Sequence, residues 1–168
     1  MEVGGIFHGV YLGLILLDYL YIAYVDFRKH YIEDLAVLIG IVLTVVYTVI
    51  FRPINETWMA IYWGFIGFAI HYVIYKIAMW YYREEAFGFG DVLLMASLGC
   101  FLTDKYFGYL LVEIMVSGIF GVIVMILKKG NIHYELPLAP LYVVSLGAFF
   151  AIGAPDVFEL FWKAACML

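Results

Sequence analysis

Long apolar segments separated by short polar ones make up most of the chain. Uncharged runs occur at 35–51, 57–75 and 136–155. Each is near the roughly 20 residues that an α-helix needs to cross the hydrocarbon core of a bilayer. The pattern predicts an all-α polytopic membrane protein with about six transmembrane helices. Their expected bounds are about 4–25, 35–51, 58–81, 87–103, 106–127 and 137–162.

The connections between these segments are too short to hold a second domain, so residues 1–168 are expected to form a single transmembrane domain. Strands of a β-barrel would alternate apolar and polar residues over about ten positions, and the long apolar runs lack that alternation. The first segment has no basic start, because the first Lys or Arg is Arg28. We therefore expect a retained span and not a cleaved signal peptide.

The composition agrees with a membrane protein and excludes other classes. Apolar residues make up 67% of the chain and charged residues 14%, whereas soluble domains average about half and about a quarter. The net charge is −5 and no basic patch occurs, so we expect membrane lipid around the chain and no nucleic-acid partner. Cys100 and Cys166 are isolated, and the histidines lack ligand spacing. We therefore expect neither a metal nor a cofactor.

The distribution of Lys and Arg predicts the orientation of the chain in the membrane. The connections after the first, third and fifth segments hold Arg28, Lys29, Lys76, Arg83, Lys128 and Lys129. The opposite side holds only Arg52, Lys105 and Lys163. Cytoplasmic loops carry an excess of Lys and Arg. The first set is thus expected in the cytoplasm, with both termini outside.

A single carboxylate stands at the edge of an apolar run in the stretch FGFGDVLLMASLGC, residues 87–100. Asp91 is preceded by Gly88 and Gly90 and followed by twelve uncharged residues. An ionisable residue at membrane depth usually faces the protein interior or a water-filled cavity. Glycine permits backbone conformations and close approaches that other residues do not, so this segment can admit an extended substrate and water beside Asp91. Taken alone, GxGD fits equally well a turn whose acid complements a helix N-terminus.

A second motif stands at the matching end of the first predicted span. The stretch YVDFRKHYIEDLAV, residues 24–37, places Asp26 after one apolar span and Asp34 before the next. In the predicted topology Asp26 ends the first span and Asp91 begins the fourth, which puts both at the cytoplasmic side. Two carboxylates 65 residues apart in sequence are thus expected at the same depth in the membrane.

Together the DFR…IED and FGFGD motifs, the six predicted spans and the prolines of ELPLAPLY closely resemble the GxGD family of intramembrane aspartic peptidases. The chain is most similar to the prepilin and preflagellin peptidases, particularly the archaeal type, over most of its length. The resemblance implies that Asp26 and Asp91 are the catalytic pair and that Gly88 and Gly90 form active-site backbone. It also implies a type IV prepilin-like or preflagellin-like substrate whose leader is cut at the cytoplasmic face of the cell membrane.

One feature of many bacterial prepilin peptidases has no counterpart in this sequence. Those enzymes carry an N-terminal cytoplasmic segment with paired cysteines and also methylate the new N-terminus of the product. The chain contains no CxxC. We therefore expect aspartic endopeptidase activity, and the resemblance does not extend to N-methyltransferase activity.

Two aspartates suit peptide hydrolysis, because the reaction needs a base to activate water and an acid to protonate the leaving nitrogen. Two close carboxylates do not readily ionise together, so they share one proton and titrate as a pair. One can then act as the base and the other as the acid. The sequence leaves open whether Asp26 or Asp91 holds the proton at the start.

Four more residues are candidates for supporting roles at the site. Asp18 lies in the first span eight residues before Asp26, on roughly the same helical face, as a buried polar partner or as a modulator of the pair. Asp34 belongs to the family-like motif. Pro137 is expected to begin a helix, and with Pro140 it is a candidate for the cytoplasmic wall of the site.

Other positions within the spans are interpreted as structural. His71 and Glu113 are lone polar residues, for which an interhelical hydrogen bond is favoured over catalysis. Gly67, in the third predicted span, is expected to tolerate alanine.

Three alternative functions stay open. A related GxGD peptidase could act on another membrane substrate, such as a remnant signal peptide. A small ion or proton transporter could use Asp18, Asp26 and Asp91 as a relay, although no inverted repeat of the kind that marks many transporters is found. A non-catalytic assembly subunit is the third, and the presence of both aspartate motifs argues against it.

Overall fold

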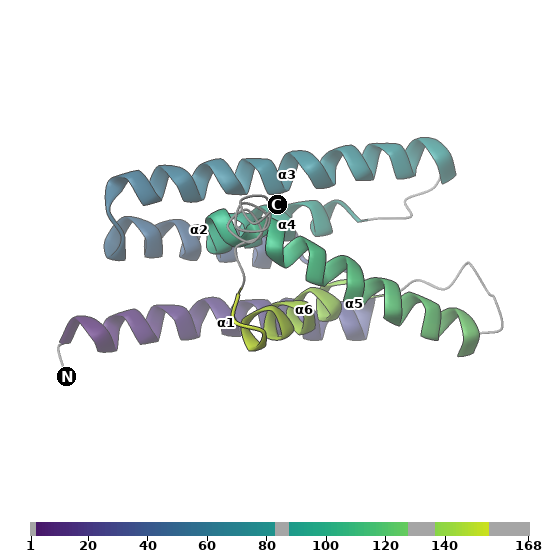
Figure 1. Cartoon of the computed structure of the whole chain (residues 1–168), viewed down its shortest axis with the longest axis horizontal. Coiled ribbons are helices and arrows are strands. Elements are labelled where there is room, and N and C mark those ends of the chain that lie inside the picture. Colours follow the sequence, from purple (N-terminus) through teal and green to yellow (C-terminus); the bar gives the residue numbers. More distant parts are fainter. Residues whose placement is uncertain (1–2, 83–87, 128–136, 155–168) are drawn as a thin grey trace, which may run out of the picture.

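Six α-helices and one 3₁₀ helix make up the described part of the chain (Figure 1). The computed structural model describes residues 3–82, 88–127 and 137–154. The helices are α1 (Val3–Lys29), α2 (Asp34–Phe51), α3 (Ile54–Tyr82), α4 (Phe89–Leu102), η1 (Thr103–Lys105), α5 (Tyr106–Leu127) and α6 (Ala139–Ala151). No strand occurs within these ranges, so the all-α prediction is confirmed for them.

Four segments are long and apolar enough to cross a membrane, as expected of a membrane protein. They are Phe7–Lys29, Asp34–Phe51, Ile54–Tyr81 and Phe89–Leu127, the last of which takes in α4, η1 and α5. α4 has 14 residues and α6 has 13. At 1.5 Å per residue each extends only about 20 Å, less than the roughly 30 Å of a hydrocarbon core. The predicted count of about six spans is therefore not confirmed.

Several helix ends follow from the local sequence. α1 ends in Arg28 and Lys29, whose charges complement the negative end of the helix dipole. His30 follows with a φ of 51°, outside the helical region. Pro53 separates α2 from α3, because a proline cannot donate the hydrogen bond that would continue α2. Thr103, with a φ of 53°, turns the chain out of α4.

α4 is the most buried helix, with ten of its 14 residues buried. It packs mainly against α3 and α2, whereas α1 packs against α2 and α6, and α5 packs against α6. Glycines on α3 bring it close to α4, as is common between membrane helices. A Cβ on Gly67 would lie 2.6 Å from the Met95 carbonyl oxygen. The expectation that Gly67 tolerates alanine is therefore wrong, because a backbone atom of α4 occupies the space.

Large apolar side chains point outward from the long helices. Leu17 on α1 is 63% exposed, Trp80 on α3 is 82% exposed and Ile126 on α5 is 72% exposed. In water, apolar patches of this extent would be unusual for a monomer. They agree with the membrane segments that the hydropathy pattern predicts.

Some of the charges that predict the orientation lie outside the described residues. These are Arg83, Lys128, Lys129 and Lys163. Cys166 and the last part of the predicted span 137–162 also lie outside them. The predicted orientation therefore stays a prediction.

Candidate active site

Asp26 lies in the last turn of α1 and is only 5% exposed. Its Oδ2 accepts a hydrogen bond of 2.9 Å from the backbone N–H of Ala139. Ala139 is the first residue of α6, and the first N–H groups of a helix have no partner within the helix. This carboxyl group therefore ties the end of α1 to the start of α6, 113 residues further along the chain.

Asp91 lies in the first turn of α4 and is 7% exposed. Its backbone N–H donates to the Gly88 carbonyl at 3.1 Å. The Tyr142 hydroxyl on α6 lies near the Asp91 carboxyl group and interacts with it, but Asp91 Oδ1 is buried without a hydrogen-bond partner among the described residues. Buried polar atoms are nearly always paired, so Oδ1 is the oxygen of this group whose hydrogen-bonding capacity is unused among the described residues.

The structure brings together the two aspartates that the sequence motifs single out. Asp26 lies close enough to Asp91 for their charges to interact. Both groups contact the start of α6, Asp26 through Ala139 and Asp91 through Tyr142. Within residues 3–82, 88–127 and 137–154, no three His, Cys, Asp or Glu side chains lie close enough to hold a metal ion. The arrangement is thus a site of two carboxyl groups from two helices, joined by a third helix.

The glycines beside Asp91 serve close packing. Gly88 precedes α4 with a φ of −72° and a ψ of 144°, which any residue can adopt. A Cβ on Gly90 would lie 2.7 Å from the Cβ of Ile32, and one on Gly88 would lie 3.1 Å from Asp91 Oδ2. Of the two roles expected for these glycines, close approach is the one that the geometry displays. Ile32, in the connection between α1 and α2, thereby fixes the start of α4.

The two prolines frame the segment that donates to Asp26. Pro140 lies in the first turn of α6 beside Ala139, and Pro137 precedes the helix. The predicted helix start at Pro137 is therefore wrong by two residues. Asp34, by contrast, begins α2 and is exposed, so the structure does not bring its side chain into the buried pair.

Asp18 belongs to a separate polar cluster deeper in the bundle. Eight residues of α1 separate it from Asp26, a rise of about 12 Å. A Cβ on Gly40 of α2 would collide with Asp18 Oδ2 and lie 3.4 Å from Ser97 Oγ. Ser97 Oγ is in turn 3.0 Å from the Tyr19 hydroxyl. Asp18 thus lies against Gly40, and its buried Oδ2 has no hydrogen-bond partner among the described residues.

Two side chains near the pair are missed by the motifs. Tyr142 is the last residue of ELPLAPLY, so the proline motif points to its segment without assigning it a contact. Glu113 on α5 interacts electrostatically with Asp91 and Tyr142 and accepts a 2.7 Å hydrogen bond from Ser117. Its place in an apolar helix is the only sequence feature that distinguishes it.

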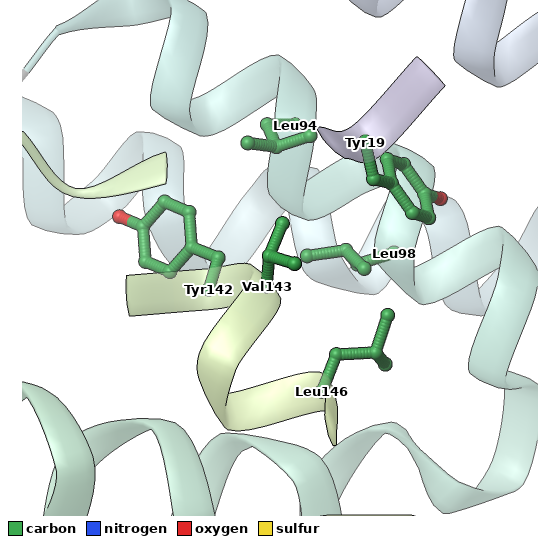
Figure 2. A pocket seen from close by; sticks show the side chains of 6 residues that line it. All are labelled: Tyr19, Leu94, Leu98, Tyr142, Val143 and Leu146. Atoms are coloured by element: carbon green, nitrogen blue, oxygen red, sulfur yellow. The ribbon is translucent and has the colours of Figure 1, made fainter. Parts of the chain in front are cut away.

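Beside the pair the core is closed and apolar. Figure 2 shows a crevice between α1, α4 and α6 whose facing walls are formed by Leu98 and Val143, with Leu146 beyond them. The crevice is too narrow for a water molecule. The Tyr142 ring covers one edge, and its hydroxyl points away from the crevice. Dry side chains thus separate the aspartate pair from the other end of the bundle.

Comparison with known protein families gives a match over most of the chain. A sequence model described as the type IV leader peptidase family matches residues 12–152, which are 141 (152 − 12 + 1) of the 168 residues. The matched range contains both aspartates, the glycines beside Asp91 and all of α6. Searches of curated proteins and of solved structures gave no significant match.

Proposed function

The chain belongs to the type IV leader peptidase family, and we propose that it is an aspartic endopeptidase that removes the leader from type IV prepilin-like or preflagellin-like proteins. The observation that supports this most directly is the buried pair of Asp26 and Asp91, which come from separate helices and interact. The family supports a peptidase with a prepilin-type substrate. The two carboxyl groups supply the acid and the base that hydrolysis requires.

In the proposed reaction, one carboxylate of the pair takes a proton from a water molecule, and the water oxygen attacks the scissile carbonyl carbon. The other aspartate, protonated, donates its proton to the leaving nitrogen as the C–N bond breaks. The pair ends with one proton, as it began, because the proton lost to the amine is replaced by the one taken from water. A second turnover therefore needs no exchange of protons with other groups.

The start of α6 has a positioning role in this proposal. The Ala139 N–H donates a hydrogen bond of 2.9 Å to Asp26 Oδ2, and the Tyr142 hydroxyl interacts with the Asp91 carboxyl group. Asp91 Oδ1 is left for the water or the substrate amide. Groups that are fixed before the substrate arrives lower the entropic cost of reaching the transition state.

We also propose that residues 1–168 form a single multi-pass domain in the cell membrane, with the aspartate pair at the cytoplasmic face. Arg28 and Lys29 lie two and three residues after Asp26, and basic residues favour the cytoplasmic side. Cys100 and Cys166 would first be replaced by serine. Lys29→Cys should then react with an impermeant thiol reagent only after the cytoplasmic side is opened, and Glu56→Cys should react in intact cells. The reverse labelling pattern would contradict this orientation.

The activity can be tested with the purified protein in detergent. It would be mixed with prepilin-like and preflagellin-like proteins, and the products would be mapped by mass spectrometry. A single cut between the leader and the apolar helix is expected, without S-adenosylmethionine and without a methyl group on the product. Cleavage of remnant signal peptides alone would establish a related peptidase with another substrate, and no cleavage of either class would contradict the peptidase proposal.

A further inference from the structure

A large cavity lies at the end of the bundle opposite the aspartate pair. It has a volume of about 880 Å³ and is bounded by α1, the end of α2, the start of α3, the end of α4, η1 and the end of α6. The aspartate pair lies instead where α1 ends and where α4 and α6 begin. The cavity is therefore separate from the proposed active site.

Two short helices leave this space open. α1 has 27 residues and α3 has 29, whereas α4 has 14 and α6 has 13. At 1.5 Å per residue, α4 and α6 are about 20 Å shorter than α1 and α3. Figure 1 shows α4 and α6 stopping short of the left-hand ends of α1, α2 and α3. The missing helical turns expose a recess at one end of the membrane segments.

The recess has an apolar wall. Leu12 and Leu16 of α1 line one side, and Phe101 of α4 and Phe150 of α6 line another. Leu16 is 44% exposed and Phe150 is 49% exposed. Contact between water and such an apolar surface is unfavourable. An acyl chain that covered the surface would remove that contact.

Two cations lie among the lining residues, one directly after α2 and one in η1. The Arg52 guanidinium lies over the Tyr47 ring at 5.5 Å, and its Nε is 3.9 Å from Glu56 Oε2. That ion contact is long, and contacts of this kind at a surface contribute little. Lys105 is exposed and has no acidic group within 4 Å among the described residues. Both cations can therefore take an anionic partner.

Two carboxyl groups also line the recess. Glu56 and Asp104 are both exposed. A ligand that carries only negative charge would be repelled by them. A ligand with a phosphate and an amine a few bonds apart would be complementary to both pairs of charges.

We propose that the recess binds one phospholipid with an amine-bearing headgroup. Its phosphodiester lies between Arg52 and Lys105, where charge-assisted hydrogen bonds are available. Its ammonium lies towards Glu56 and Asp104, and one hydrocarbon chain covers Leu16 and its neighbours. Such a lipid would fill the space that the short helices leave and hold the connections at this end of the bundle together.

The test is native mass spectrometry of the full chain after delipidation in detergent, with phosphatidylethanolamine added as the probe. One lipid per chain is expected to bind, at least about five times more tightly than phosphatidylglycerol, since the ammonium adds a charge-assisted contact. Equal binding of the two lipids, or no bound lipid, would overturn the proposal. Inorganic phosphate at millimolar concentration should not displace the lipid, and displacement would reduce the site to a simple anion site.

Two variants separate charge from shape. Arg52→Gln combined with Lys105→Gln should weaken lipid binding about tenfold or more, because two charge-assisted contacts are lost. Leu16→Trp should also weaken lipid binding about tenfold or more, because the larger side chain would occupy space beside the apolar wall. Lys29→Gln combined with Lys76→Gln removes two cations elsewhere and should leave binding unchanged. Retained thermal stability and peptidase activity would show that the variants fold.

A second copy of the chain is the main competing occupant. In that case size-exclusion chromatography with light scattering would give a dimer, and Leu16→Trp would convert it to a monomer without any change in lipid binding. That result would overturn the lipid proposal. A monomer that loses lipid on Leu16→Trp would support it.

Discussion

Asp26 and Asp18 lie on the same helix, two turns apart, but their surroundings differ. Asp26 is buried beside a second carboxyl group and accepts a hydrogen bond from the start of α6. Asp18 is half-buried beside Gly40, and its Oδ2 has no hydrogen-bond partner among the described residues. The first environment contains the two groups that acid–base catalysis needs. The second environment places one carboxyl group against a glycine of the neighbouring helix.

The difference shows that position in the membrane does not by itself identify a catalytic aspartate. Both side chains interrupt an apolar helix, and both would be flagged as ionisable residues at membrane depth. What distinguishes Asp26 from Asp18 is the second carboxyl group, that of Asp91, beside it. The comparison therefore predicts separate consequences for substitutions at the two places, catalysis at one and stability at the other.

The largest effect is expected from removing either member of the pair. Asp26→Asn and Asp91→Asn should each lower the initial rate of leader cleavage by about a thousandfold or more, because an acid or a base is lost. The double variant should be no slower than either single variant, since the two residues act as one unit. Cleavage would be followed by mass spectrometry on detergent-purified protein of equal thermal stability.

Asp18→Asn is the matched control for this experiment. It also converts a carboxyl group of α1 to an amide, and it should leave cleavage within a few-fold of the original rate. A thousandfold loss at Asp18 would abolish the distinction between the two environments and favour a relay of three carboxyl groups.

The second-largest effect is expected from disturbing the packing that positions Asp91. In Gly90→Ala the new Cβ would lie 2.7 Å from the Cβ of Ile32, so α4 must shift by several tenths of an ångström. Cleavage should fall about tenfold to a hundredfold, because small displacements of a catalytic group are costly. Ile32→Gly in the same chain should restore part of the rate, because it removes the Cβ that the new side chain meets.

The control for the glycine test is Gly118→Ala, whose Cβ would have no neighbour within 4 Å. It should change neither cleavage nor thermal stability appreciably. Loss at Gly90 without any rescue by Ile32→Gly would mean that backbone freedom, and not contact with Ile32, is what Gly90 contributes.

The third-largest effect is expected from removing the Tyr142 hydroxyl, which interacts with Asp91. Tyr142→Phe removes the hydroxyl that interacts with Asp91 and keeps the ring at the edge of the apolar crevice. A loss of about tenfold in kcat is expected, since hydrogen bonds to charged groups contribute about 1.5–3 kcal/mol. Tyr62→Phe, at an exposed position of α3, is the control. An unchanged kcat in Tyr142→Phe would remove the hydroxyl from the positioning role.

The positions of the helices are predicted well from hydropathy. Which of them are long enough to cross the membrane is predicted less well. The predicted segment 106–127 coincides with α5, and 35–51 misses α2 by one residue at its start. α4 is correctly located but ends at a turn around Thr103, whose positive φ has no mark in the apolar pattern. Hydropathy reports which residues avoid water, and it does not report where a helix stops short of the membrane surface.

The site is predictable only where short motifs carry it. Asp26 and Asp91 stand out because each follows or precedes an apolar run and belongs to a family-like motif. The Ala139 contact joins residues 113 positions apart, and it depends on how α6 packs against α1. Gly67 illustrates the same limit, since only the position of the Met95 carbonyl on another helix reveals that alanine does not fit.

The smallest effect on catalysis is expected at the Asp18 cluster, where stability should change instead. In Gly40→Ala the new Cβ would collide with Asp18 Oδ2, so α1 and α2 must separate or the carboxyl group must leave its position. Overpacking of this kind costs about 1–3 kcal/mol, and the thermal unfolding temperature in detergent should fall by several degrees. Cleavage at low temperature should stay within a few-fold, because Asp26 lies about 12 Å further along α1. Asp18→Ala in the Gly40→Ala chain should restore stability by removing the colliding oxygen, whereas Gly147→Ala, which has open space around it, should have no effect. If Gly40→Ala abolished cleavage without lowering stability, the Asp18 cluster would belong to the catalytic site after all.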